Sequence, residues 1–167
     1  DPVPLAEARG HRGVVDGHDD RIAPASVLGE VVHQQPGHLE LMDERATLIG
    51  GPGADNMTGG SGTDVADYSG APAGVNVALC YAAAIATCGN SADGTGANDK
   101  VYQMEHLIGS AFADTLNGAD ATIAIGLLIE GGLGIDTITG GAGMDTIYGD
   151  AGDDIIDGGG GDDELHG

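Results

Sequence analysis

The chain has 167 residues and a formal net charge of −22, with 32 glycines but only five aromatic residues. This length suits one ordinary domain, or a small domain with an appendage, whose core must be thin and built from aliphatic side chains. The negative charge argues against nucleic acid as a partner and opposes compaction unless cations bind, and no apolar run is long enough to span a bilayer.

Residues 1–49 form an N-terminal segment for which the sequence indicates no fold. They hold nine acidic and four basic residues, a formal charge of −5, which leaves −17 for residues 50–167. The two parts therefore differ in physical character, and we expect the first to be irregular.

Residues 50–67 form a first block of two nonapeptides, "GGPGADNMT" (50–58) and "GGSGTDVAD" (59–67). Glycine dominates the first four positions, aspartate occupies the sixth (Asp55 and Asp64), and an apolar residue occupies the eighth. Glycine tolerates the positive φ and close backbone approach of a tight turn, so each nonapeptide reads as a turn followed by a short strand.

Residues 68–108 form an intervening segment between the blocks. Apolar residues alternate in "GVNVALC" and "KVYQMEHLI", which predicts extra strands, and "GNSADGTGAND" (89–99) reads as a polar loop between them. Cys80 and Cys88 are too few for a disulfide framework. In an oxidising compartment they could form a local disulfide, and otherwise they would be two free, buried thiols.

Residues 109–167 form a second block, truncated at its C-terminus. "GSAFADTLN" (109–117) keeps the template but has lost two glycines, and residues 118–130 fit a degenerate coil without a full cation site. Four nonapeptides then follow without interruption: "GGLGIDTIT" (131–139), "GGAGMDTIY" (140–148), "GDAGDDIID" (149–157) and "GGGGDDELH" (158–166). Because the chain stops at Gly167, one residue into another repeat, we expect it to be a piece of a longer protein.

One turn and one strand per nonapeptide give a coil of 18 residues with a turn on either side. Successive coils then stack as an all-β, parallel β-roll, a solenoid in which repeats n and n+2 lie above one another. The single inward residue of each strand is apolar: Met57, Ala66, Leu116, Ile138, Ile147, Ile156 and Leu165.

This stacking places Asp136 beside Asp154 on one side of the roll and Asp145 beside Asp163 on the other. Carboxylates so close repel one another, and Ca²⁺, which takes six to eight oxygen ligands, would resolve the repulsion. The glycine turns would supply further oxygens from their carbonyls: Gly132, Gly134, Gly141, Gly143, Gly149, Gly152, Gly158 and Gly161. Mg²⁺ fits these loose turns less well, and no His or Cys at a ligand position favours a transition metal.

The remaining aspartates of the template are weaker candidates for the same role. We expect the intervening segment to let residues 109–117 stack on the first block, so that Asp114 shares an ion with Asp55 or Asp64. A strict 18-residue spacing gives Asp114 no partner in the other direction, because Gly132 stands there.

The nonapeptide GGxGxDxUx is the motif of the RTX, or hemolysin-type, calcium-binding repeat, and residues 50–167 resemble this family. The resemblance implies a right-handed roll that binds several Ca²⁺ ions. It also implies a secreted protein that the type I secretion machinery exports unfolded and that folds in the calcium-rich medium outside the cell.

Hydrophobic burial of one residue in nine cannot offset an ordering cost of about 1–2 kcal/mol per backbone residue. Metal binding must then supply much of the folding free energy, and we expect residues 131–166 to be largely disordered without calcium. A disordered acidic linker is the alternative that composition alone permits, but such a linker would not hold isoleucine and aspartate in a fixed spacing.

We do not expect this chain to be an enzyme. The zinc proteases of the larger RTX family carry HExxHxxGxxH, whereas here His33 is followed by Gln34, Pro36 would break the helix and the third histidine is absent. No G-x-S-x-G elbow or P-loop is present either. The parent protein stays open: it could be a secreted hydrolase, such as a serralysin-like protease or a lipase with its catalytic domain upstream, or an adhesin or S-layer protein in which the roll is a spacer.

Overall fold

The computed structural model describes residues 13–16, 31–35, 38–41, 45–51, 53–81, 91–96, 98–118 and 125–167. These residues contain β-strands and no helix. Accordingly, none of the described residues belongs to a helix that could cross a membrane.

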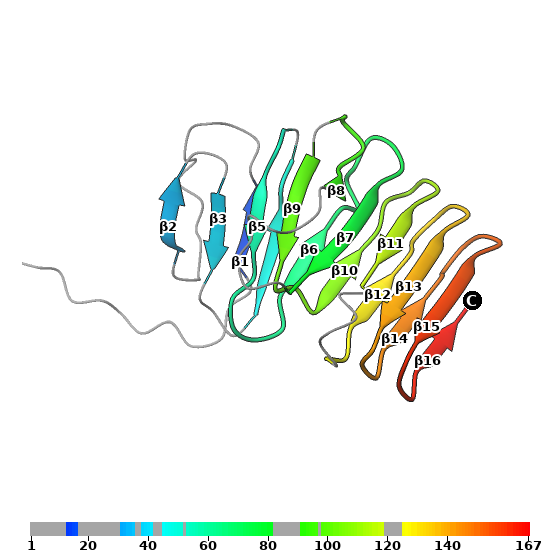
Figure 1. Ribbon diagram of the computed structural model, residues 1–167. Coiled ribbons are helices and arrows are strands. Elements are labelled where there is room, and N and C mark those ends of the chain that lie inside the picture. Colours follow the sequence, from blue (N-terminus) through cyan, green and yellow to red (C-terminus); the bar gives the residue numbers. More distant parts are fainter. Residues whose placement is uncertain are drawn as a thin grey trace, which may run out of the picture.

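The strands form two sheets that lie face to face and stack along one axis (Figure 1). The first sheet has seven strands, all parallel, in the spatial order β1 (Gly13–Asp16), β4 (Ala46–Ile49), β6 (Val65–Asp67), β10 (His106–Ile108), β12 (Leu128–Glu130), β14 (Thr146–Tyr148) and β16 (Glu164–His166). The second sheet has nine, in the order β15 (Ile155–Gly159), β13 (Thr137–Gly141), β11 (Thr115–Asn117), β7 (Asn76–Cys80), β8 (Ser91–Ala92), β9 (Asn98–Tyr102), β5 (Asn56–Thr58), β3 (His38–Leu41) and β2 (Val31–Gln35).

Successive strands alternate between the sheets from β4 to β7 and again from β9 to β16. Two strands and two turns therefore make one coil. Thr137 pairs with Ile155 and Thr146 with Glu164, in each case 18 residues further along the chain. This alternation and the parallel register confirm the β-roll that the nonapeptides predict.

The intervening segment interrupts this order in the second sheet. Strand β9 follows β7 in sequence but lies between β5 and β7 in space, parallel to both. Strand β8 is antiparallel to β7 and β9 and falls inside the predicted polar loop. The chain thus runs back along the roll from β7 to β9, which lies beside β5, before β10 continues the first sheet beside β6.

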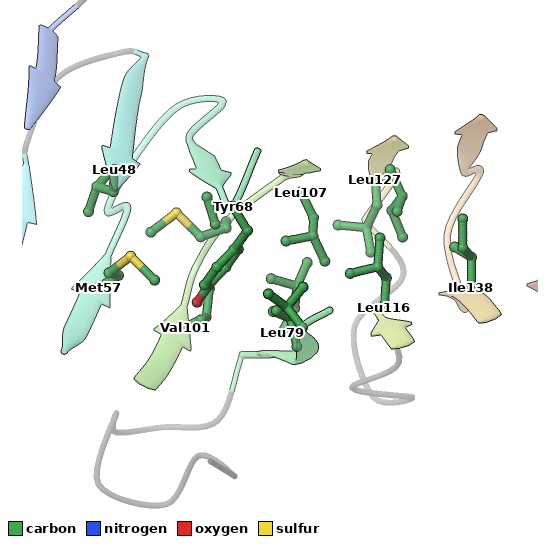
Figure 2. Packing of buried hydrophobic residues seen from close by; sticks show 14 of the residues in the cluster. Leu48, Met57, Tyr68, Leu79, Val101, Leu107, Leu116, Leu127 and Ile138 are labelled. Atoms are coloured by element: carbon green, nitrogen blue, oxygen red, sulfur yellow. The ribbon is translucent and has the colours of Figure 1, made fainter. Parts of the chain in front are cut away.

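The core is a single file of aliphatic side chains between the sheets, roughly one from each strand (Figure 2). Of the seven inward residues that the template predicts, Met57, Ala66, Leu116, Ile138 and Ile147 are fully buried, and Ile156 packs against them partly buried. Leu165 is 48% exposed because β16 is the last strand of its sheet in the described chain.

Part of the N-terminal segment joins the roll. Strands β1 and β4 extend the first sheet, and β3 pairs in parallel with β5 in the second. The sequence indicated no fold here because these strands lack the glycine turns that mark the repeats. In the intervening segment, Cys80 is disulfide-bonded, whereas Cys88 lies outside the described residues.

Candidate metal centre

Acidic residues form two rows, one along each side of the roll. Each member stands directly before a strand or, in the case of Asp99, at the start of one. The second-sheet row consists of Asp55, Asp99, Asp114, Asp136 and Asp154. The first-sheet row consists of Asp64, Glu105, Asp145 and Asp163, with Leu127 between Glu105 and Asp145.

Backbone N–H groups link the members of a row. The N–H of Asp136 donates to Oδ1 of Asp154 over 2.9 Å, and the N–H of Asp145 donates to Oδ1 of Asp163 over 2.9 Å. Both pairs are 18 residues apart, so the predicted partners are confirmed as neighbours. Asp64 lies in the same kind of row: its Oδ1 accepts the N–H of Ala46, and its own N–H donates to Glu105.

Asp114 is not a neighbour of Asp55 or Asp64, and that expectation was wrong. Its N–H donates to Oδ1 of Asp136 over 2.8 Å, because residues 118–130 lengthen this coil to 22 residues and so restore a partner. Ser110 donates both its N–H and its hydroxyl to the Asp114 carboxylate, over 2.6 and 2.7 Å. The N–H of Val75 is a third donor to this carboxylate, whereas Asp136 accepts one, so Asp114 fits a cation less well than Asp136.

Three repeat aspartates, Asp136, Asp145 and Asp154, have a buried oxygen without a hydrogen-bond partner. Oδ1 of Asp136 and of Asp145 accepts a backbone N–H. Oδ2 of each is buried and has no hydrogen-bond partner, as is Oδ2 of Asp154. A buried acceptor without a donor is costly, so these oxygens require a ligand that is absent from the protein itself.

A second oxygen lies near the orphaned atoms of Asp136 and Asp145. A β-carbon placed on Gly131 would lie 2.6 Å from Oδ2 of Asp136 and 2.7 Å from the carbonyl oxygen of Gly149. In the same way, a β-carbon on Gly140 would lie 2.4 Å from Oδ2 of Asp145 and 2.5 Å from the carbonyl oxygen of Gly158. The first glycine of a repeat thus leaves a space bordered by a carboxylate and by the carbonyl of the next coil.

The other predicted glycines bring adjacent turns into backbone contact. A β-carbon on Gly152 would lie 1.5 Å from the carbonyl oxygen of Gly134, and one on Gly161 would lie 1.9 Å from that of Gly143. The carbonyl oxygen of Gly141 faces Gly159 in the same manner, and Gly132 lies against the Ser110 carbonyl. The carbonyls of Gly134, Gly141 and Gly143 thus face the next coil, and that of Gly141 also accepts the N–H of Gly160. The role of these glycines as ligands stays a prediction.

Burial and mutual repulsion act on the carboxylates of both rows. Burial is the largest influence that raises the pKa of Asp136, followed among the raising influences by the nearby charges of Asp114, Asp154 and Asp150, while the N–H of Asp114 lowers it. Burial likewise raises the pKa of Asp145, with Asp163 adding to the effect. The protein alone therefore disfavours the ionised form of these groups.

The donor set fits Ca²⁺. Among the described residues, no group of three or more His, Cys, Asp or Glu side chains converges on one point. Backbone carbonyls must therefore supply most of the ligands to any ion in a turn. A hard cation with a high and flexible coordination number suits carbonyls and single carboxylates, whereas Zn²⁺ would require a tetrahedral set of side chains.

Sequence reasoning missed Asp99, Glu105, Gly131 and Gly140. The template excluded Asp99 because only the first glycine position of the repeat, at Gly94, holds a glycine there, and it excluded Glu105 because residues 100–104 contain no glycine. A shorter signal would have found both: an acidic residue two positions before an inward apolar one, as in Asp99 with Val101 and Glu105 with Leu107. The repeat aspartates share this spacing with Asp136 and Ile138.

Two segments, residues 47–67 and 130–165, match the family model of the RTX calcium-binding nonapeptide repeat in four copies. No curated protein matches the chain. The matched segments contain Asp55, Asp64, Asp136, Asp145 and Asp154, but neither Asp99 nor Glu105.

Proposed function

On the premise that this chain carries RTX calcium-binding nonapeptide repeats, and so contains a calcium-binding repeat module, we propose that it is part of a secreted bacterial protein. The module is exported unfolded by a type I system and folds on binding Ca²⁺ outside the cell. Its ligands are the repeat aspartates and the carbonyls of the glycine turns, and the chain itself has no catalytic role.

One observation carries the calcium dependence: the orphaned Oδ2 atoms of Asp136, Asp145 and Asp154. Each lies in a turn where the first glycine leaves room beside it. With 27 acidic and five basic residues in the chain, protein cations are too few to neutralise these rows. A bound divalent cation supplies the missing charge and couples its binding free energy to folding.

The proposed export follows from the same excess of acidic over basic residues. Without calcium, a segment with a charge of −17 over residues 50–167 repels itself and stays extended. An extended chain suits passage through a secretion channel, and calcium outside the cell then drives folding. A hydrolase or an adhesin could carry such a module, and finding HExxH, G-x-S-x-G or long arrays of β-domains in the parent gene would distinguish these parents.

Circular dichroism of the full chain tests the proposal. We expect a largely disordered spectrum in calcium-free buffer at neutral pH and a β-rich spectrum in millimolar Ca²⁺. Millimolar Mg²⁺ is the matched control and should leave most of the chain disordered. A β-rich spectrum that is the same with and without calcium would contradict calcium-driven folding.

A further inference from the structure

The space beside Gly50 differs from those beside the other first glycines of the described repeats. A β-carbon on Gly50 would lie 3.0 Å from Oδ2 of Asp55 and 3.4 Å from Oδ2 of Asp99. Beside Gly131 and Gly140 the second oxygen is a backbone carbonyl. Here it belongs to a second carboxylate, so two acidic side chains border one space.

Asp99 reaches this position because β9 replaces a repeat coil. Asn56 pairs with Lys100, which brings Asp55 opposite Asp99 although the two are 44 residues apart in sequence. Asp99 and Val101 point inward from β9, whereas Lys100 lies on the other face of the strand. The inserted strand thus adds a buried carboxylate to the second-sheet row outside the repeat template.

Hydrogen bonds hold Asp99 in a single orientation. Its Oδ1 accepts the N–H of Asp55 over 3.0 Å, and its Oδ2 accepts the hydroxyl of Tyr68 over 3.1 Å. Tyr68 is buried in the core next to Met57 and Val101, so its hydroxyl cannot turn away into solvent (Figure 2). The Asp99 carboxylate is therefore preorganised.

Asp55, in contrast, has an oxygen with nothing to bind. The side chain is 9% exposed, and its buried Oδ2 has no hydrogen-bond partner. This oxygen and Oδ2 of the fixed Asp99 carboxylate both lie close to Gly50. Two buried carboxylates this close repel each other, and the arrangement is unfavourable unless a cation binds them.

We propose that Asp55 and Asp99 hold a calcium ion at a composite site, in which the inserted strand β9 takes the place of a repeat coil. The site rests on the proposed function, since it needs a chain that binds calcium. Asp55 lies in a matched repeat, whereas Asp99 lies outside the matched segments. Two carboxylates attract a divalent ion more strongly than one carboxylate and a carbonyl. The composite site therefore fills at a lower calcium concentration than the turns of residues 131–166.

Calcium titration of the full chain, with the ions counted by equilibrium dialysis, tests this site. Asp99→Asn keeps an oxygen to accept the Asp55 N–H but removes the charge. We expect this variant to bind one ion fewer per chain and to lose the tightest binding phase, by at least tenfold in affinity. Asp153→Asn, at an exposed residue, is the matched control and should bind as the unmodified chain does.

Asp154→Asn separates this proposal from the general one. It should weaken binding in the C-terminal turns and leave the tightest phase intact. If Asp99→Asn keeps the full number of ions and the tight phase while Asp154→Asn weakens binding, the composite site is wrong and the calcium-binding module stands. If the unmodified chain binds no calcium, both proposals fail.

A lanthanide provides a second measurement that does not depend on how well Asp99→Asn folds. Tb³⁺ replaces Ca²⁺ at oxygen sites and emits when a nearby tyrosine is excited. Because the Tyr68 hydroxyl contacts Asp99, the first equivalent of Tb³⁺ should emit strongly on tyrosine excitation, and Tyr68→Phe should remove more than half of that emission. Unchanged emission in Tyr68→Phe would overturn the composite site.

Discussion

The backbone N–H of Asp136 donates to Oδ1 of Asp154 over 2.9 Å, while Oδ2 of Asp154 is buried without a partner. The two oxygens of one carboxylate therefore have different roles. Oδ1 fixes the position of one coil on the next, and Oδ2 is left for a cation. Asp145 divides its oxygens in the same way, with Leu127 as the backbone donor.

This division predicts that Asp154→Asn and Asp154→Ala differ in the stability of the calcium-bound form. Asparagine keeps the acceptor for Asp136 but places a neutral group at the cation, so calcium affinity should fall while the folded form at saturating calcium persists. Alanine also removes the acceptor, which leaves the Asp136 N–H unpaired and should cost about 1–3 kcal/mol more. Calorimetric titration and chemical unfolding in excess calcium measure the two effects.

Asp153→Asn is the control for both, because this neighbouring side chain is exposed. It removes the same charge from the chain without touching a row. Equal loss of affinity in Asp153→Asn and Asp154→Asn would mean that overall charge, and not the position of Oδ2, determines calcium binding.

Gly131→Ala should disturb a cation site without changing any charge. The added β-carbon would lie 2.6 Å from Oδ2 of Asp136 and 2.7 Å from the Gly149 carbonyl, both closer than packed atoms allow. We expect a loss of about 1–3 kcal/mol in the calcium-bound form, as in other overpacked sites, together with weaker calcium binding. Thermal unfolding at fixed calcium concentration provides the measurement.

Gly160→Ala is the matched control for that substitution. A β-carbon there would have its nearest neighbour at 3.9 Å, an ordinary contact. The unfolding midpoint of Gly131→Ala should therefore be clearly lower than that of Gly160→Ala. Similar midpoints for the two variants would show that the calcium-bound form does not require a glycine at the first position.

The repeats themselves could be predicted from the sequence in detail. The spacing of nine, the inward residue of each strand and the 18-residue pairing of Asp136 with Asp154 all follow from the template. They follow because every coil repeats the same local chemistry, so a single turn and strand determine the whole stack.

What the sequence could not predict depends on contacts between distant segments. Strand β9 lies between β5 and β7, and Asp99 faces Asp55 across 44 residues of chain. Asp114 lies beside Asp136 because the irregular coil of 22 residues keeps the alternation of strands between the two sheets. No local pattern encodes either arrangement, since both result from how the intervening segments close.

Asp150→Gly should stabilise the calcium-bound roll. Asp150 stands at the second position of its repeat with φ of 68°, in the left-handed region where Gly51, Gly60 and Gly132 stand in other repeats. Replacing an L-residue there with glycine relieves about 1 kcal/mol of backbone strain. It also removes a charge that raises the pKa of Asp136.

Thermal unfolding in excess calcium tests this substitution, and Asp150→Ala is its control. Alanine removes the charge but keeps the backbone strain, so Asp150→Ala should raise the unfolding midpoint less than Asp150→Gly does. A lower calcium affinity in both variants would instead assign Asp150 a role as a ligand.

The calcium-free chain should become more ordered as the pH falls. Burial raises the pKa of Asp55 and of Asp99 from 3.8 to about 6, with the charge of Asp93 adding to both. A carboxyl group whose pKa is higher in the folded form holds its proton more tightly there. Its stabilising contribution is therefore fully present below the ordinary value and is lost as the pH rises through about 6.

Calcium reverses this trend, because the cation binds the ionised carboxylates and competes with protons. In calcium-stripped buffer we expect a stronger β-type circular dichroism signal at pH 4.5 than at pH 7.5, where the chain is largely disordered. In excess calcium the unfolding midpoint should be higher at pH 7.5 than at pH 4.5. The double variant Asp55→Asn, Asp99→Asn removes the two carboxyl groups whose pKa rises to about 6 and should flatten the calcium-free dependence on pH. A calcium-free chain that is more stable at pH 7.5 than at pH 4.5 would contradict the assignment of these buried carboxylates as groups that require a cation.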